Sequence, residues 1–114
     1  MSAWLNIVGV GADGLAGLPA ASRTLVETAE LIVGGDRHLA MVTNGSARKL
    51  AWEFPLDSLV QEITAARASR VVVLATGDPM AFGIGSTLAR HFEPDDMTIL
   101  PAPGAFSLAA ARLA

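Results

Sequence analysis

The chain has 114 residues, of which 52% are hydrophobic and 5% aromatic, and its formal net charge is −3 at pH 7. Its eight Lys and Arg residues form no run, which argues against a nucleic-acid partner. There is no cysteine for a disulfide or a thiolate metal site, and no apolar run approaches the ~20 residues that span a bilayer. We therefore expect one cytoplasmic domain without a metal.

Predicted strands and helices alternate along the chain. In chain order, apolar periodicity and turn residues predict a strand at 4–10, a helix at 19–29, a strand at 31–33, a short helix at 37–42 capped by Asp36, a weak strand at 47–52, a helix from Pro55 to Ala66, a strand at 71–75, a helix at 85–92, a strand at 97–100 and a helix at 105–113. This alternation favours an α/β fold with a five-stranded parallel sheet between two helical layers. Because the chain stops just after a predicted helix, without a polar tail, we expect residues 1–114 to form a single domain that is part of a longer protein.

The most informative segment is Thr76-Gly77-Asp78-Pro79, which follows the predicted strand at 71–75. In an open α/β sheet such a turn lies at the carboxyl edge, where ligands bind. A turn of this composition presents backbone N–H and C=O groups that no side chain covers, and one carboxylate, at that edge. The alternative is an ordinary connection in which Asp78 caps the next helix.

A second glycine turn follows the first predicted strand. Gly9 to Gly14 has the G-x-G-x-x-G spacing of a dinucleotide-binding turn, so a nucleotide-dependent oxidoreductase is one alternative. Two features weaken it: residues 15–18 separate the turn from the next predicted helix, and neither Glu30 nor Asp36 stands at the end of the second predicted strand. With neither a G-x-S-x-G nor a Walker lysine, the glycine turns suit a transferase whose cofactor carries the reactive group.

Four segments, in order along nearly the whole chain, resemble the tetrapyrrole methylases. They are the opening motif at 7–15, the Gly-Gly-x-Arg-His-Leu segment at 34–39, the Gly-Asp-Pro turn at 77–79 and the segment at 101–113. Within that family they most resemble the branch that methylates C5 of a precorrin-6Y-type corrin precursor in cobalamin biosynthesis. The resemblance implies two α/β domains with S-adenosylmethionine bound between them, of which this chain would be the first.

The resemblance also implies the cofactor contacts, which would release S-adenosylhomocysteine as product. The family usually has a proline where this sequence has Ala12, which weakens the assignment at that position alone. The cofactor contacts implied for this chain are Ala12, Thr76, Gly77, Asp78, Ala81, Phe106 and Ser107.

The implied substrate carries many carboxylates, so cationic side chains are candidate contacts. We place Gly11, Arg37 and His38 at the substrate, with Arg48 as a further candidate; the alternative for both arginines is a solvated surface charge. Related methylases have a proton-accepting Asp before an Arg after the second strand, and Asp36 stands near that position, although it could simply cap a helix. We further expect a homodimer. A non-catalytic, truncated binding or assembly domain is the third alternative.

Overall fold

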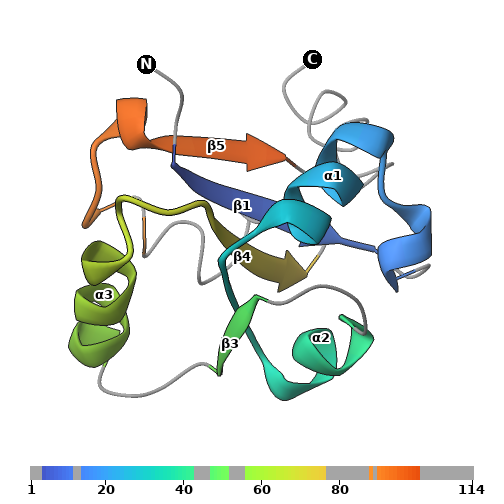
Figure 1. Ribbon diagram of the computed structural model, residues 1–114, viewed down its shortest axis with the longest axis horizontal. Coiled ribbons are helices and arrows are strands. Elements are labelled where there is room, and N and C mark those ends of the chain that lie inside the picture. Colours follow the sequence, from blue (N-terminus) through green and yellow to red (C-terminus); the bar gives the residue numbers. More distant parts are fainter. Residues whose placement is uncertain are drawn as a thin grey trace, which may run out of the picture.

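The protein is built on a five-stranded parallel sheet. The computed structural model describes residues 4–11, 14–42, 47–51, 56–76, 88 and 90–100. The strands lie in the order β3-β2-β4-β1-β5, and every neighbouring pair is parallel. Their bounds are β1 Leu5–Val10, β2 Leu31–Gly34, β3 Arg48–Ala51, β4 Val71–Thr76 and β5 Met97–Leu100. In Figure 1 the arrows of β1, β4 and β5 point the same way, towards the side on which the 3-10 turn after β1 lies.

The helices agree with the predicted ones to within about a residue at most ends. They are α1 Ala20–Thr28, α2 Asp36–Met41 and α3 Leu56–Ala65, with 3-10 turns η1 at Gly14–Gly17 and η2 at Pro94–Asp96. Of the helix predicted at 85–92, Leu88 is helical, whereas residues 90–92 form a turn and a bend, so the predicted end is too late; residues 85–87 and 89 lie outside the described residues. The helix predicted at 105–113 lies wholly outside them.

The predicted cap of the second helix is wrong. Gly35, not Asp36, is the N-cap residue of α2, in the extended conformation with φ −72° and ψ 163°. Asp36 is the first helical residue, where a carboxylate favours the positive end of the helix dipole without acting as a cap. A glycine at the cap brings α2 close to the end of β2 and leaves the Asp36 side chain exposed.

Each face of the sheet is covered by its own set of helices. Val71 and Val73 of β4 pack with Leu59, Ile63 and the helical Leu88 in one core cluster. On the opposite face, Val72 and Leu74 pack in a second cluster, which α1 and α2 cover through Val26, Leu39 and Met41. Because β4 is buried on both faces, its sequence is a continuous apolar run instead of an alternating one.

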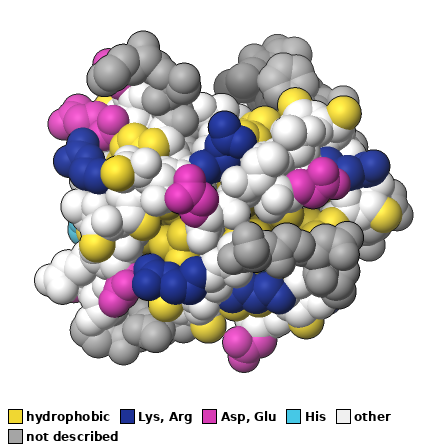
Figure 2. Space-filling view, in the orientation of Figure 1, with side chains coloured by type: hydrophobic (Ala, Val, Ile, Leu, Met, Phe, Trp, Pro, Cys, Tyr) yellow, Lys and Arg dark blue, Asp and Glu magenta, His cyan; other side chains and the backbone are white. Residues whose placement is uncertain are grey.

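The surface carries both charges. Figure 2 shows basic and acidic side chains interspersed over one face, with no continuous patch of either sign among the coloured residues. Arg48 and Glu62 form an exposed ion pair, with 3.6 Å between Nη2 and Oε2, of a kind that contributes less than about 1 kcal/mol. Within the described part of the chain, no helix has both the length and the hydropathy that crossing a membrane requires.

Candidate functional site

Two central strands extend beyond their neighbours at the carboxyl edge of the sheet. The pairing of β1 with β4 continues to Val10 opposite Thr76. The pairing of β2 with β4 ends at Val33 opposite Val73, and that of β1 with β5 ends at Val8 opposite Leu100. The strand ends from which the two predicted turns start therefore lie side by side, although 66 positions separate Val10 from Thr76 in the sequence.

The connections at this edge diverge to opposite faces. After β1 and β2 the chain passes to α1 and α2 on one face, whereas Leu88, which follows β4, packs with α3 on the other. Such a divergence opens a crevice outside the strand ends, which is the usual ligand site of an open parallel sheet. The geometry thus supports the predicted position of the site between the ends of β1, β2 and β4.

The first glycine turn does not have the form of a dinucleotide-binding turn. The Gly14 N–H donates to the Gly11 carbonyl at 3.0 Å, and Gly14 has a φ of +63°, which favours glycine. The turn leads into η1, and α1 begins only at Ala20, so no α-helix starts at the turn. Glu30 precedes β2 at the opposite end of the strand. These positions count against the nucleotide-dependent alternative.

The start of α2 brings three predicted residues to the edge. Asp36 and Arg37 are exposed, whereas His38 is half-buried. A Cβ placed on Gly34 would lie 3.5 Å from the Cβ of His38 and 3.4 Å from the Cβ of Leu74, so His38 lies over the end of β2 and beside β4. Burial lowers the pKa of the His38 imidazole and the Arg37 guanidinium lowers it further, while the neighbouring Leu74 backbone opposes both effects. The neutral imidazole is therefore the favoured form at neutral pH.

The described part of the edge suits a ligand that is held by backbone. Gly9 and Ala75 stand opposite each other in the register of β1 and β4, so two small residues precede the strand ends. Gly11 is partly exposed just beyond them. Of the predicted cofactor contacts only Thr76 is placed, as the last residue of β4. The others lie outside the described residues and remain predictions: Ala12, Gly77, Asp78, Ala81, Phe106 and Ser107.

Arg48 is not part of this edge. It is the first residue of β3 and stands opposite Leu31, the first residue of β2, so it lies at the amino end of the sheet. Its guanidinium pairs with Glu62 of α3. The sequence placed Arg48 near the substrate only because of its charge, and the strand register corrects that expectation.

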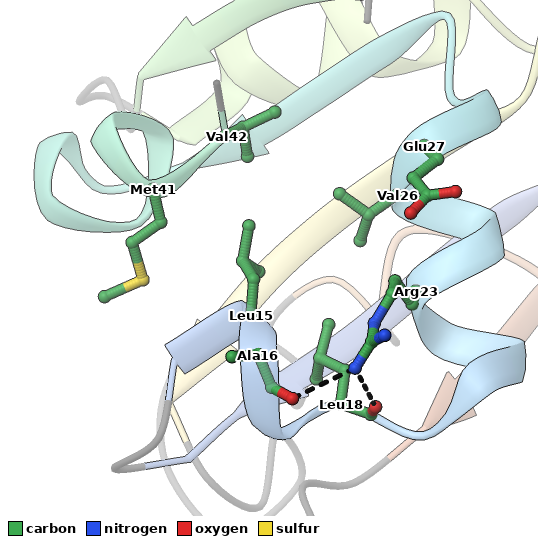
Figure 3. A pocket seen from close by; sticks show the side chains of 8 residues that line it. All are labelled: Leu15, Ala16, Leu18, Arg23, Val26, Glu27, Met41 and Val42. Carbon is green, nitrogen blue, oxygen red and sulfur yellow. Dashed lines mark hydrogen bonds between the residues drawn. The ribbon is translucent and has the colours of Figure 1, made fainter. Parts of the chain in front are cut away.

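A pocket of about 240 Å³ lies between η1, α1 and the end of α2. Figure 3 shows its apolar walls, which include Leu15 and Met41, and the Arg23 guanidinium turned towards η1. Arg23 Nη2 donates to the carbonyl oxygens of Ala16, at 3.0 Å, and Leu18, at 3.4 Å. Arg23 therefore stabilises the turn after β1, a role that its position in an exposed helix turn gave no reason to predict. Among the described residues, none of those that line the pocket is a predicted site residue.

The strand order and the divergent carboxyl edge define a parallel α/β domain with its ligand site at the strand ends. A family model described as "Tetrapyrrole (Corrin/Porphyrin) Methylases" matches residues 5–114, and the chain belongs to this family. The family membership and the five-stranded parallel fold expected from the sequence are both confirmed.

Individual relatives agree with this membership. The chain is 47% identical to the decarboxylating precorrin-6Y C(5,15)-methyltransferase of Sinorhizobium sp, over 99% of this chain and 28% of that protein. It is 33% identical to the cobalt-precorrin-7 C(5)-methyltransferase of Salmonella typhimurium, over 85% of this chain and 48% of that protein. The chain thus spans between a quarter and half of the length of these relatives. The crystal structure of a uroporphyrin III C-methyl transferase from Thermus thermophilus has the same fold, with a TM-score of 0.62 and 24% identity over 86% of this chain and 48% of that one.

Proposed function

We propose that the chain is the cofactor-binding domain of an S-adenosylmethionine-dependent C-methyltransferase, which methylates C5 of a precorrin-6Y-type corrin precursor in cobalamin biosynthesis. The observation that carries the proposal is the joint extension of β1 and β4 beyond their neighbours, which brings the two glycine turns together at one edge. The two named relatives, both C5-methylating by name, support the substrate class. A cytoplasmic location is part of the same proposal and rests on the sequence alone.

In this proposal the protein binds and orients, and the cofactor supplies an activated methyl group from its sulfonium. The ends of β1 and β4 would hold the cofactor through the backbone, with Asp78 placing a carboxylate near the sulfonium charge. Holding two reactants in line can lower a barrier by about 7–11 kcal/mol, so orientation supplies most of the advantage. The exposed Arg37 guanidinium would attract substrate carboxylates. Asp36, exposed in the first turn of α2, is the proposed proton acceptor.

Isothermal titration of the 114-residue chain tests the cofactor class. We expect weak binding of S-adenosylhomocysteine, because the remaining part of the site would belong to a second domain, and no binding of NAD. The substitution Asp78→Asn should weaken binding of S-adenosylmethionine, which carries the sulfonium, about tenfold or more, in keeping with the loss of a charge-assisted contact. Asp95→Asn is the matched control, since it removes the same charge from the exposed turn before β5 at the opposite edge. Tight NAD binding without a response to S-adenosylhomocysteine would refute the proposal.

Self-association, most simply as a homodimer, belongs to the same proposal. The relatives extend well beyond this chain, and a surface that the rest of such a protein would cover becomes available to a second copy. The edge strand β5 contributes the partly exposed apolar side chains of Met97, Ile99 and Leu100 to the surface of the described residues. Analytical ultracentrifugation at high concentration should give a mass of about twice 11.8 kDa. A single monomeric species under those conditions would contradict the proposed homodimer.

A further inference from the structure

The end of η1 is closed by a side chain from α1. The last carbonyl groups of a helix have no N–H partner within the helix. In η1 the Leu15 carbonyl accepts the Leu18 N–H at 3.2 Å. The carbonyl oxygens of Ala16 and Leu18 instead accept from Arg23 Nη2, at 3.0 Å and 3.4 Å (Figure 3). One guanidinium nitrogen therefore serves two neighbouring backbone acceptors at the end of η1.

The place of Arg23 is fixed by the first turn of α1. Its own N–H donates to the Pro19 carbonyl at 2.9 Å, and Pro19 is the N-cap residue of the helix. Leu18, which is 4% exposed, packs in the same core cluster as Val26 of α1 and anchors the connection between η1 and α1. The Arg23 side chain thus reaches back over a short, anchored connection, so its hydrogen bonds require little additional ordering of the backbone.

Apolar packing alone holds η1 weakly. All four of its residues, Gly14–Gly17, are partly or fully exposed. Elements of a protein interior are normally in close contact, but a pocket of about 240 Å³ lies between η1, α1 and the end of α2. Arg23 lines this pocket and connects α1 to η1 at its wall, as Figure 3 shows. Its hydrogen bonds are therefore a large part of what holds η1 in place.

The position of η1 influences the position of the first glycine turn. The Gly14 N–H, the first of η1, donates to the Gly11 carbonyl at 3.0 Å. On its other side η1 contacts α2, and a Cβ placed on Gly14 would lie 3.6 Å from Met41 Sδ. Gly11 is a predicted substrate contact, and the next residue in the sequence, Ala12, is a predicted cofactor contact. A shift of η1 would therefore be transmitted to the turn in which both stand.

We propose that Arg23 is a positioning residue, whose guanidinium holds η1 against α1 and thereby fixes the first glycine turn at the carboxyl edge of the sheet. The inference rests on the proposed function for its effect on the cofactor, and on the hydrogen bonds of Arg23 for its structural premise. It assigns a task to an exposed side chain that lies outside the glycine motifs. Arg23 influences cofactor affinity through η1 and the turn, and not by contact with cofactor or substrate.

NMR of the wild-type chain tests the structural premise, because a protein of 11.8 kDa gives signals for single side chains. Restricted rotation about the Nε–Cζ bond should give separate signals for Nη1 and Nη2 of Arg23. Nη2 should also show a through-hydrogen-bond coupling to the Ala16 carbonyl carbon. Arg67, which is exposed after α3, should show the averaged signal of a rotating guanidinium. An equally averaged signal at Arg23 would overturn the proposal.

Substitutions separate positioning from direct contact. Arg23→Met keeps an unbranched apolar side chain but removes the donors. It should shift the backbone amides of Gly14 and Leu18 and weaken S-adenosylhomocysteine binding about three- to tenfold, as expected for lost hydrogen bonds. Arg23→Lys, which keeps the charge and an ammonium donor, should retain part of both properties. Arg67→Met removes the same charge elsewhere and should change neither. Weaker binding with unmoved η1 amides would identify a direct ligand contact and refute the proposal.

Gly14 offers a test that leaves the guanidinium intact. Gly14→Ala should disturb the same turn, because alanine at a φ of +63° is strained, and should weaken S-adenosylhomocysteine binding. If both substitutions act through the turn, Gly14→Ala combined with Arg23→Met should weaken binding by less than the product of the single effects. Effects that multiply would count against the proposal. A wild-type chain that binds no S-adenosylhomocysteine would contradict the proposed function, whereas the η1 amides of Arg23→Met would still show whether Arg23 holds the turn.

Discussion

The substitution Asn6→Asp is expected to destabilise the domain by about 3 kcal/mol or more at pH 7, a large share of the about 5–15 kcal/mol that holds a typical domain folded. Asn6 is 5% exposed within β1, and its Nδ2 donates to the carbonyl oxygens of Val71, at 3.3 Å, and Trp4, at 3.4 Å. A carboxylate of the same size would point its oxygens at two carbonyl oxygens without a proton to share. Urea denaturation of the variant and wild type measures the difference.

The pH dependence identifies the cause of this loss. Burial among acceptors should raise the pKa of the introduced carboxyl group in the folded state above its unfolded value of about 3.9. The folded variant then retains its proton to a higher pH than the unfolded chain. The extra instability should begin near pH 4, grow as the pH rises through the folded-state pKa, and remain constant above it.

A control of similar size distinguishes charge from shape. Asn6→Leu removes the donor but buries no charge, and the Trp4 carbonyl keeps the Val71 N–H as a partner at 3.0 Å. We expect it to cost only about 1 kcal/mol, independently of pH. If Asn6→Asp and Asn6→Leu are equally stable at pH 7, the buried donor at this position has been misassigned.

The second large effect is expected at the interface between α3 and the sheet. Ile63→Ala should lower the free energy of unfolding by about 2–5 kcal/mol, through lost apolar burial and the cavity that remains. Ile63 is 0% exposed and, with the equally buried Leu59 one turn earlier, fixes α3 against β4. A shift of the urea midpoint with an unchanged slope would show a loss of stability within the same two-state transition.

The neighbouring residue provides the matched control. Glu62→Ala changes an adjacent position of the same helix, but its side chain is 51% exposed and its one ion pair, with Arg48, is a surface pair. We expect a change of less than about 1 kcal/mol. Equal effects at Ile63 and Glu62 would mean that helix propensity, and not packing on the sheet, determines the stability contributed by α3.

Much of the fold follows from local pattern. The apolar runs that became β1 and β4 are buried on both faces, so they lack alternation and indicate a parallel sheet covered by helices. The helices could be predicted equally well, because apolar residues at helical spacing, such as Leu59 and Ile63, lie on one side of the helix and face the core. The error at Asp36 arose because an acidic residue is suited both to the cap and to the first turn, and only the backbone conformation of Gly35 distinguishes the two.

The candidate site was harder to predict from local sequence pattern. Charge alone suggested that Arg48 faces the substrate, but the register of β3 on β2 puts it at the other end of the sheet. His38 and Leu74, which are 36 positions apart in the sequence, both lie against Gly34 at the point where the pairing of β2 with β4 stops. The periodicity of apolar residues does not indicate where the pairing of two strands ends or which distant residues meet there.

The sequence by itself therefore determined the parallel α/β class, the glycine turns and the family resemblance, because each depends on residues close together in the chain. Only the tertiary structure decided the order β3-β2-β4-β1-β5, which makes β1 and β4 neighbours and lets them extend together. The reason is physical: hydrogen bonds between strands and packing between layers join segments far apart in sequence. Which strands meet is decided by the fit of the whole core.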